Sequence, residues 1–156
     1  MKARLAGSGD MERVVELWRE LMAVHQPLEQ ELYAVELHSS QTYGAWVRRN
    51  VNGGDGFVGV VPVGGEIAGY ILAARGLRAP IFKVREVGMI FDLVVAREHR
   101  RKGVGRLLVE FARQRFSNMG IGFLQVNFDV SNAQASVFWA ALGFQTRLAE
   151  AYSRQK

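Results

Sequence analysis

The stretch Arg97–Phe116, REHRRKGVGRLLVEFARQRF, decides how this chain is organised. It places seven basic residues and two glutamates around a pair of glycines, Gly103 and Gly105. An apolar stripe at helical spacing overlaps and follows the glycines, made of Val104, Leu107, Leu108, Phe111 and Ala112. A glycine-containing loop that opens a helix directs several unpaired backbone N–H groups to one point. The stretch therefore predicts a loop and a helix start that bind an anion such as a phosphate.

The composition of the whole chain fits one compact domain spanning residues 1–156, because 49% of the residues are hydrophobic. The formal net charge is +5, and the stretch 97–116 carries all of this excess. Such a localised charge favours a small anion over a broad nucleic-acid surface, so we expect no nucleic-acid partner. The chain has no cysteine, which excludes disulfides, thiolate metal sites and a cysteine nucleophile. We expect no metal.

Hydropathy along the chain gives no sign of membrane attachment. No apolar leader segment follows Met1, and no apolar run is long enough to cross a bilayer. We therefore expect a cytoplasmic protein without a membrane partner.

Regular elements can be assigned along most of the chain from apolar spacing and from helix-breaking residues. We expect a strand near residues 3–5, a helix capped by Asp10 and stopped by Pro27, a helical segment to about Asn50, a hairpin turning at Gly64–Gly65, a strand over about Val84–Ala96, the helix after Gly103, a strand over Phe123–Val130, and a helix from Asn132 to Gly143. This order, β-α-α-β-β-β-α-β-α, predicts an α/β domain with an antiparallel first half.

Other phosphate-binding loops fit the glycines less well. A Walker loop requires G-x-x-x-x-G-K-[ST], and the segment RRKGVGRLL lacks it. The dinucleotide pattern G-x-G-x-x-G fails because Leu108 occupies the position of its third glycine. Taken alone, the glycines and arginines fit a plain turn with solvated charges equally well.

Three ordered pieces of the chain resemble the GNAT superfamily of acyl-CoA-dependent N-acetyltransferases. The pattern Arg100-x-x-Gly103-x-Gly105 is similar to the family signature R/Q-x-x-G-x-G/A. Before it, DLVVAREHR resembles the strand that leads into the signature, and after it Asn132–Phe144 resembles the segment N-x-x-A-x-x-F-Y-x-x-x-G-F. The resemblance implies a mixed, mainly antiparallel central sheet flanked by helices, with splayed central strands, and acetyl-CoA as the acyl donor.

The resemblance also implies where the coenzyme lies, between the splayed strands Met89–Ala96 and Phe123–Val130. Backbone groups of Leu93 and Val95 hold the pantetheine in this arrangement, and an N–H near Val94 or Val95 polarises the thioester carbonyl. The implied coenzyme-binding residues are Leu93, Val94, Val95, Arg100, Arg101, Lys102, Gly103, Val104, Gly105, Arg106, Asn132, Phe138 and Trp139. Asn132 is also expected to cap the final helix.

Acetyl transfer needs a neutral amine, so a base must take the proton of the ammonium. Asp92 is the candidate base and Glu86 the second choice, while Phe91 occupies the position where relatives most often have an acidic residue. Trp139 stands where relatives often have a tyrosine that protonates the departing thiolate. An indole is too weak an acid for this role. Tyr152, water or unaided departure of the thiolate are the alternatives.

The sequence gives less information about the residues that bind the acceptor. His25 lies at the end of the first expected helix, where the acceptor pocket of the family begins. It has two interpretations, a structural histidine that closes the helix and a residue that faces the acceptor.

The sequence therefore predicts an N-acetyltransferase that moves an acetyl group from acetyl-CoA to a primary amine in a ternary complex, with catalytic residues Asp92 and Val95. We expect a small-molecule acceptor, and a protein or peptide N-terminus is the alternative. An acyl-CoA-binding regulatory module with little transferase activity is a second hypothesis, motivated by Phe91 and Trp139. A nucleic-acid-binding domain is a third, although the basic stretch lacks interleaved aromatic residues. By analogy with relatives, a homodimer is expected.

Overall fold

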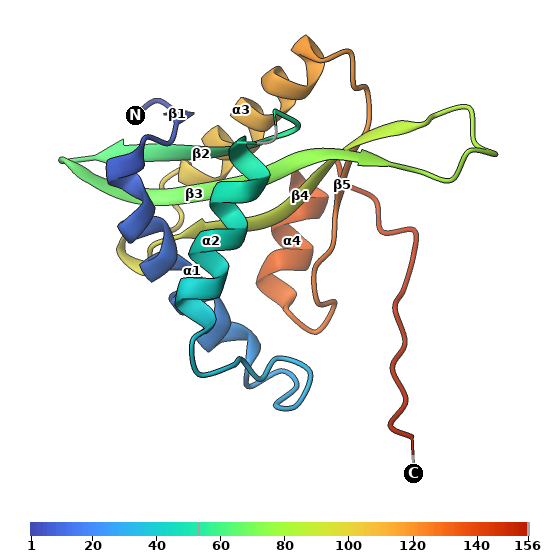
Figure 1. Ribbon diagram of the computed structural model, residues 1–156, viewed down its shortest axis with the longest axis horizontal. Helices are drawn as coiled ribbons and strands as arrows, with labels where there is room; N and C mark the ends of the chain where they lie inside the picture. The colour runs from blue at the N-terminus through green and yellow to red at the C-terminus, as the bar shows by residue number, and fades with distance from the viewer. Residues whose placement is uncertain (53, 156) are drawn as a thin grey trace.

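The structure is a computed structural model that describes residues 1–52 and 54–155, with side chains for 1–49 and 54–155. Its helices are α1 (Met11–His25), α2 (Ser39–Asn52), α3 (Val104–Asn118) and α4 (Ala133–Ala141), and short 3₁₀ turns precede α1 (η1, Ser8–Asp10) and α3 (η2, Arg97–His99). Its strands are β1 (Arg4–Leu5), β2 (Gly56–Val63), β3 (Glu66–Leu77), β4 (Glu86–Val95) and β5 (Leu124–Val126). The predicted order of strands and helices is confirmed (Figure 1).

The five strands form one open sheet in the order β1-β2-β3-β4-β5. All neighbours are antiparallel except β4 and β5, which run parallel. Helices cover both faces, with α1 and α2 on one side and α3 and α4 on the other (Figure 1). The prediction of a mixed, mainly antiparallel sheet flanked by helices is therefore confirmed.

Two sequence-based expectations about element ends need correction. The carboxylate of Asp10 does not cap α1, because it turns back to accept hydrogen bonds from the backbone N–H of Gly7 (2.7 Å) and from Arg4 (2.6 Å). The strand expected over Phe123–Val130 is only Leu124–Val126. Its apolar alternation continues to Val130, but a strand needs a pairing partner as well as a pattern, and β4 supplies one for three residues only.

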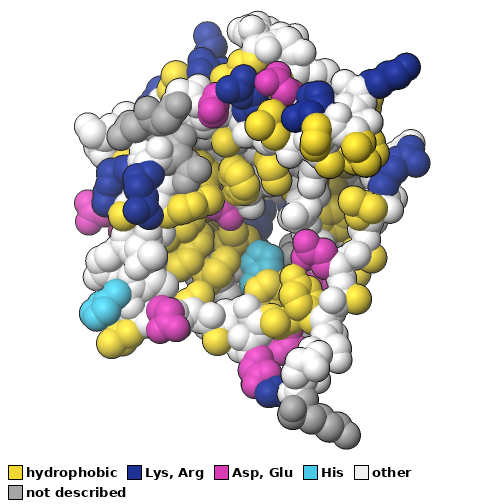
Figure 2. Space-filling view, turned by 45° about the vertical axis from the view of Figure 1, so that its right-hand side comes forward, with side chains coloured by type: hydrophobic (Ala, Val, Ile, Leu, Met, Phe, Trp, Pro, Cys, Tyr) yellow, Lys and Arg dark blue, Asp and Glu magenta, His cyan; other side chains and the backbone are white. Residues whose placement is uncertain are grey.

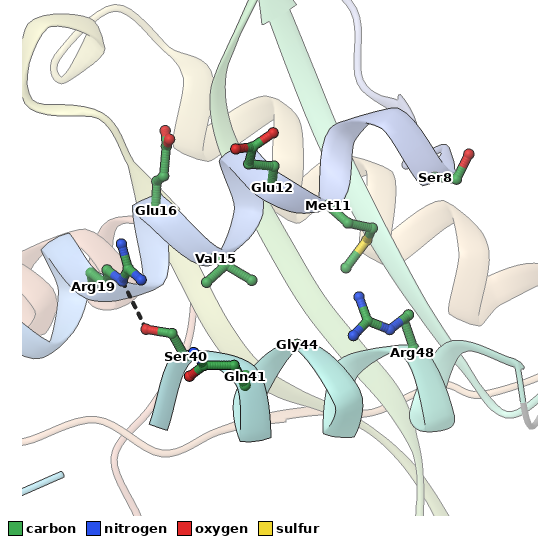
Figure 3. Close-up of a pocket in the computed structure, with 10 residues that line it drawn as sticks. All are labelled: Ser8, Met11, Glu12, Val15, Glu16, Arg19, Ser40, Gln41, Gly44 and Arg48. Atoms are coloured by element: carbon green, nitrogen blue, oxygen red, sulfur yellow. Dashed lines mark hydrogen bonds between the residues drawn. The ribbon is translucent and has the colours of Figure 1, made fainter. Parts of the chain in front are cut away.

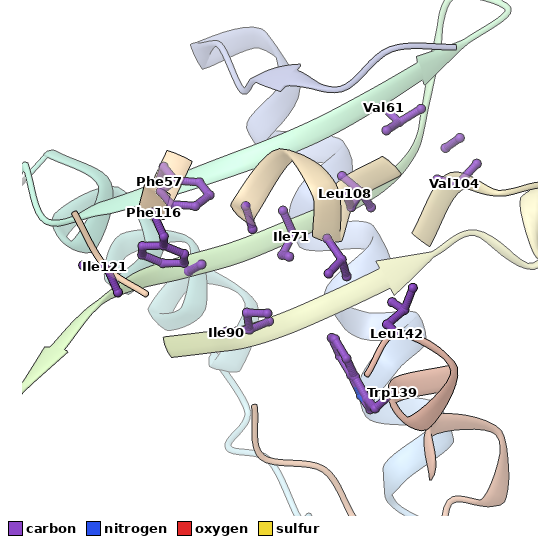
Figure 4. Packing of buried hydrophobic residues seen from close by; sticks show 14 residues of the cluster. Phe57, Val61, Ile71, Ile90, Val104, Leu108, Phe116, Ile121, Trp139 and Leu142 are labelled. Carbon is purple, nitrogen blue, oxygen red and sulfur yellow. The ribbon is translucent and has the colours of Figure 1, made fainter. Parts of the chain in front are cut away.

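The hydrophobic core is divided by the sheet into two clusters. The larger one joins the sheet to α3 and α4, and Figure 4 shows its members converging from both layers, among them Phe57, Ile71, Leu108, Phe116 and Trp139. The second joins the sheet to α1 and α2. Within the part of the chain that the structure describes, no helix combines the length and apolar character needed to cross a membrane.

Helix α3 lies unusually close to the sheet because glycines on the strands face its aromatic side chains. A Cβ built on Gly88 in β4 falls 2.5 Å from the ring of Phe116, which is fully buried. A Cβ on Gly59 in β2 falls 2.6 Å from the ring of Phe111. Neither ring can be accommodated beside a larger strand residue without moving the helix.

Replacing Gly88 with Ala tests this close packing. We expect Gly88→Ala to lower the free energy of unfolding by about 1–3 kcal/mol, the usual cost of overpacking a core. Denaturant titration measures the change. Gly122→Ala is the matched control, because its Cβ meets nothing within 4 Å, and it should stay within about 0.5 kcal/mol of the wild type. Equal stability of the two variants would contradict the packing argument.

Candidate functional site

The site is organised by the parting of β4 from β5. The ladder between them comprises the pairs Gly88–Leu124, Met89–Gln125 and Ile90–Val126. Strand β4 continues five residues further, to Val95, whereas β5 ends at Val126. The sheet is therefore open along the second half of β4, which is the splayed arrangement that the sequence resemblance implied.

The backbone pairing of β4 with β3 shows which peptide groups face this opening. The N–H of Ala96, just after β4, donates to the carbonyl of Ala68 in β3 (2.9 Å). Because antiparallel pairs alternate between hydrogen-bonded and non-hydrogen-bonded, Val94 also turns its N–H and C=O toward β3. Leu93 and Val95 turn theirs to the edge that β5 has left. Of the two N–H donors considered from the sequence, this register favours Val95.

A β-bulge at Phe91 determines where the side chains of β4 point. Leu72 pairs with Asp92 and the next residue, Ala73, pairs with Ile90, so Phe91 is an extra residue in the strand. Ile90 packs in the cluster under α3. After the bulge, Phe91 and Asp92 both lie on the α1/α2 side, where the Phe91 ring meets Trp46 edge-on with centroids 5.6 Å apart. The bulge thus aims Asp92 at the helices α1 and α2.

Asp92 accepts a hydrogen bond from a tyrosine hydroxyl on α2. The donor is Tyr43, 2.7 Å from Oδ2, and the hydroxyls of Tyr43 and Tyr70 lie 2.9 Å apart. Burial raises the pKa of Asp92 above its ordinary value, while the hydrogen bond from Tyr43 and the nearby His25 partly oppose that rise. A carboxylate whose pKa is raised by burial is a stronger base than an exposed aspartate, as proton abstraction requires.

Glu86, the second choice for a base, lies elsewhere. It begins β4, pairs with Leu77 and forms an ion pair with Arg75 (3.1 Å). The opening beside β4 starts only after Ile90. The structure therefore does not bring Glu86 to the site.

His25 lies at the C-terminal end of α1, close to both Asp92 and Asp129. Its Nδ1 donates to the carbonyl of Leu21, 2.9 Å away, because a carbonyl oxygen can only accept. The Tyr33 ring is 5.2 Å away, and its hydroxyl donates to Asp129 (2.8 Å). Hydrogen bonds from Ser131 and Tyr33, with a smaller effect of His25, lower the pKa of Asp129. His25 thus both closes the helix and lies between two acidic side chains.

The loop that enters α3, residues 100–106, is basic and mostly exposed, and we call it the anion cradle. Arg101 (φ 61°) and Gly103 (φ 85°) adopt left-handed backbone conformations within three positions, which curves the chain so that successive N–H groups can converge. The side chains of Arg100, Arg101, Lys102 and Arg106 are exposed, and none forms an ion pair with a described residue. The Nε of Arg100 donates to the Val95 carbonyl (3.0 Å), which ties the cradle to the end of β4.

Two members of the cradle have structural roles as well. Val104 is buried in the core, so only its backbone can reach a ligand. A Cβ on Gly105 would lie 3.1 Å from the ring of Phe138, so this glycine lets α4 pack against the start of α3.

Helix α4 contributes the last group of predicted residues. Asn132 caps it as predicted, accepting a hydrogen bond from the N–H of Ala135 (3.1 Å). Trp139 is only 5% exposed and contacts the rings of Phe138 and Phe144. The centroid of each phenylalanine ring lies 5.0 Å from the centroid of the Trp139 ring. Its environment is that of a core residue.

The surface has a hollow on the face seen in Figure 2 and a separate groove between α1 and α2. Figure 2 brings the β5 side of the sheet forward and shows hydrophobic side chains lining a hollow, with histidine and acidic side chains beside it. A separate groove of about 470 Å³ lies between α1 and α2 and is lined by residues such as Val15, Ser40 and Arg48 (Figure 3). That groove contains neither Asp92 nor any residue of the cradle. Among residues 1–52 and 54–155, no three His, Asp or Glu side chains are grouped to hold a metal.

Comparison with known proteins identifies the family. Residues 14–144 match the Acetyltransferase (GNAT) family. The chain belongs to this family. No curated protein matches the sequence.

Solved structures share the GNAT fold over the whole chain at low sequence identity. A mutant of the BH1408 protein from Bacillus halodurans is 20% identical, with 100% of each chain covered and a TM-score of 0.85. Aminoglycoside N-acetyltransferase AAC(6')-Iy in complex with CoA is 15% identical, with 99% and 94% covered and a TM-score of 0.80. The aminoglycoside acetyltransferase meta-AAC0020 from an uncultured soil metagenomic sample, in complex with sisomicin, is 19% identical, with 99% and 96% covered and a TM-score of 0.71.

The sequence did not predict the two tyrosines, Tyr43 and Tyr70, whose hydroxyls are linked by hydrogen bonds to Asp92. Tyr70 belongs to an apolar run in β3, and Tyr43 to the weakly patterned helix α2. A signal did exist for Tyr70, because a tyrosine inside a fully buried strand needs a partner for its hydroxyl. Nothing in the sequence of this GNAT protein indicates that the partner is Tyr43.

The raised pKa of Asp92 predicts that this residue costs stability. A carboxyl whose pKa is higher in the folded state holds its proton longer when folded, so the wild type loses stability as the pH rises through the interval between its unfolded and folded pKa values. Asp92→Asn removes the charge and keeps an oxygen for Tyr43. We expect it to raise the free energy of unfolding at pH 7 by about 0.5–2 kcal/mol.

Denaturant titrations of both proteins from pH 3 to pH 8 measure this effect. The advantage of Asp92→Asn should be absent at the acidic end and grow with pH. A difference that does not change with pH would contradict the assignment of a raised pKa to Asp92.

Proposed function

We propose that this GNAT protein transfers an acetyl group from acetyl-CoA to a primary amine of a small molecule, by direct attack in a ternary complex. The observation that carries the proposal is the position of Asp92. Its carboxylate, with a pKa raised by burial, lies on the α1/α2 side of β4, in the part of the strand that β5 leaves unpaired. The anion cradle begins directly after the end of the same strand.

The donor is assigned to the cradle and the opened edge of β4. Acetyl-CoA carries a pyrophosphate, which matches the unpaired cations and converging N–H groups of residues 100–106 in charge and in donor type. The outward-facing peptide groups of Leu93 and Val95 are suited to hydrogen-bond its pantetheine. Phe138 packs beside Gly105 of the cradle and on Trp139, and with Asn132 at the cap of α4 it is assigned to the coenzyme by the family resemblance.

In the proposed reaction the amine nitrogen forms a bond to the thioester carbon and the bond from that carbon to sulfur breaks. Asp92 takes the proton that the amine must lose, directly or through a water molecule. The N–H of Val95 stabilises the negative charge that develops on the carbonyl oxygen. The CoA thiolate departs with the bonding electrons.

Neither of the two acids considered for the thiolate, Trp139 and Tyr152, is suited to the role in the part of the chain that the structure describes. Trp139 is buried and cannot supply a proton, and the hydroxyl of the exposed Tyr152 donates to Glu150 on the same tail (2.8 Å). A thiol has a reference pKa of about 8.5, so its thiolate is a tolerable leaving group near neutral pH. We propose that the thiolate leaves without a dedicated acid and is protonated by water.

The acceptor is proposed to be a cationic small amine. Asp92 and Asp129 both lie close to His25, so the region between α1 and the opened sheet is acidic on balance. Two of the solved structures with this fold are described as aminoglycoside acetyltransferases. Aminoglycosides are therefore the first acceptors to test, followed by polyamines, amino acids and peptide N-termini.

A regulatory module that binds acyl-CoA with little turnover is the competing function, because Phe91 and Trp139 replace two common acid–base residues. Release of free CoA thiol with the acceptor panel distinguishes the two. Binding of acetyl-CoA without thiol release for any acceptor would favour the module. We further propose a cytoplasmic homodimer, for which sedimentation equilibrium is the test of assembly.

The cradle assignment predicts a defect in binding. Gly103→Glu should reduce the affinity for acetyl-CoA at least a hundredfold, because the side chain places an anion in the cradle and the φ of 85° is unfavourable for any residue but glycine. Gly103→Ala carries the backbone strain without the charge and should cause a smaller loss. Calorimetric titration measures both.

Gly122→Glu is the control for the added charge, because Gly122 is exposed and outside the cradle. It should bind acetyl-CoA like the wild type. Circular dichroism confirms that each variant is folded. Unchanged affinity in a folded Gly103→Glu protein would refute the cradle.

The role of Asp92 predicts a pH-dependent defect. Asp92→Asn should lower kcat/KM at pH 7 by roughly 10²–10⁴-fold, the usual contribution of a general base. Raising the pH toward the pKa of the acceptor amine should restore much of the rate, because the amine then loses its proton to solvent. Full activity at pH 7 in a folded variant would remove Asp92 from the mechanism.

A further inference from the structure

We propose that Tyr43 and Tyr70 form a hydroxyl relay that positions Asp92 and keeps it in the charged state that accepts a proton. The two tyrosines act through Asp92 and are therefore positioning residues. The inference rests on the proposed role of Asp92 as the base, and it concerns side chains that the mechanism above does not use.

The directions of the hydrogen bonds follow from the number of protons available. The Tyr43 hydroxyl has one proton and donates it to Oδ2 of Asp92 (2.7 Å). Its oxygen must then accept in the second bond, so Tyr70 is the donor at 2.9 Å. The chain of donation runs from β3 through α2 to β4, from Tyr70 to Tyr43 to Asp92. Each bond in such a chain polarises the next.

Burial argues that the hydroxyls are retained for the carboxylate. Tyr70 is 0% exposed and Tyr43 is 8% exposed, both in the cluster beneath α1 and α2. A hydroxyl in such surroundings is costly unless it is hydrogen-bonded, and phenylalanine would fill the same space. The described structure gives these two hydroxyls only each other and Asp92 as side-chain partners.

The relay is held rigidly on the helix side. The Tyr43 ring stacks on Trp18 of α1, with centroids 4.5 Å apart and an angle of 10° between the rings. This stacking fixes the direction of the hydroxyl, and the bulge at Phe91 fixes the direction of Asp92. The carboxylate is thereby held in one orientation, with Oδ2 bound by Tyr43.

The electrostatic balance gives the relay a measurable effect. The titratable groups that face Asp92 are Tyr43 on α2, Tyr70 on β3 and His25 on α1. Burial of Asp92 favours its neutral form, and the hydrogen bond from Tyr43 opposes this. Removing that hydroxyl shifts the carboxyl toward its protonated form, which is inactive as a base.

The variants Tyr43→Phe and Tyr70→Phe test the relay in the full chain. The acid limb of the kcat/KM profile should move to higher pH in both, and further in Tyr43→Phe. At pH 6, on that limb, the kcat/KM of Tyr43→Phe should lie roughly tenfold below its high-pH plateau. Tyr70→Phe should lose roughly two- to threefold, since it only weakens the remaining bond. The KM for acetyl-CoA should not change.

A second readout separates this inference from the proposed function. Carbon-13 NMR titration of the Asp92 carboxyl, assigned by its absence in Asp92→Asn, reports its protonation without any turnover. The midpoint should rise in Tyr43→Phe and, by less, in Tyr70→Phe. Tyr33→Phe is the matched control, because its hydroxyl donates to Asp129 and should leave the Asp92 midpoint unchanged.

The outcomes are distinct. If Asp92→Asn is fully active, the base assignment fails, while a raised midpoint in Tyr43→Phe still supports the relay. If both tyrosine variants lose stability but titrate like the wild type, the hydroxyls are structural and the relay is refuted. A midpoint that falls in Tyr43→Phe would also refute it.

Discussion

The bulge at Phe91 is the constraint on which the site depends. In a regular strand successive side chains point to opposite faces of the sheet, so without the bulge Asp92 would lie on the face opposite to Phe91. With it, the carboxylate reaches the hydroxyl of Tyr43, while Leu93 and Val95 turn their peptide groups to the opening. The bulge also coincides with the end of the ladder to β5. The extra residue therefore determines which way the Asp92 carboxylate points, and it lies where the edge of β4 becomes unpaired.

The basic loop and the close packing of α3 reinforce the same geometry. Glycines on the strands allow the aromatic side chains of α3 to approach the sheet, and Gly105 allows α4 to approach α3. The helix that follows from the cradle, α3, is thus fixed against the strand that carries Asp92. The charge of the cradle needs no partner within the protein, because its cations remain exposed beside the end of β4.

The sequence predicts the helices, turns and caps of this structure well, because apolar spacing and helix-breaking residues act locally. The helix after Gly103, the hairpin at Gly64–Gly65 and the cap at Asn132 all follow from neighbours along the chain. The signature around Gly103 also predicts the tight turn into α3, where Gly103 has a left-handed backbone conformation. These features need no knowledge of tertiary contacts.

The parts that escaped prediction depend on pairing between distant segments. The alternating pattern of Phe123–Val130 suggests a long strand, but β5 pairs with β4 at three positions and ends at Val126. The bulge is visible only in the register of β3 against β4. The link between Tyr70 and Asp92 through Tyr43 joins three elements, and no local pattern specifies it.

The sheet divides the core into two clusters, one with α3 and α4 and one with α1 and α2. In the proposed reaction the first cluster supports the cradle for the donor, and the second supports the side of β4 on which Asp92 meets Tyr43. If the proposed assignment of the two sides holds, substitutions on α1 or α2 change the surroundings of the acceptor and leave the cluster that supports the cradle unaltered. Such a division would let one scaffold evolve toward new acceptors while it keeps the same donor.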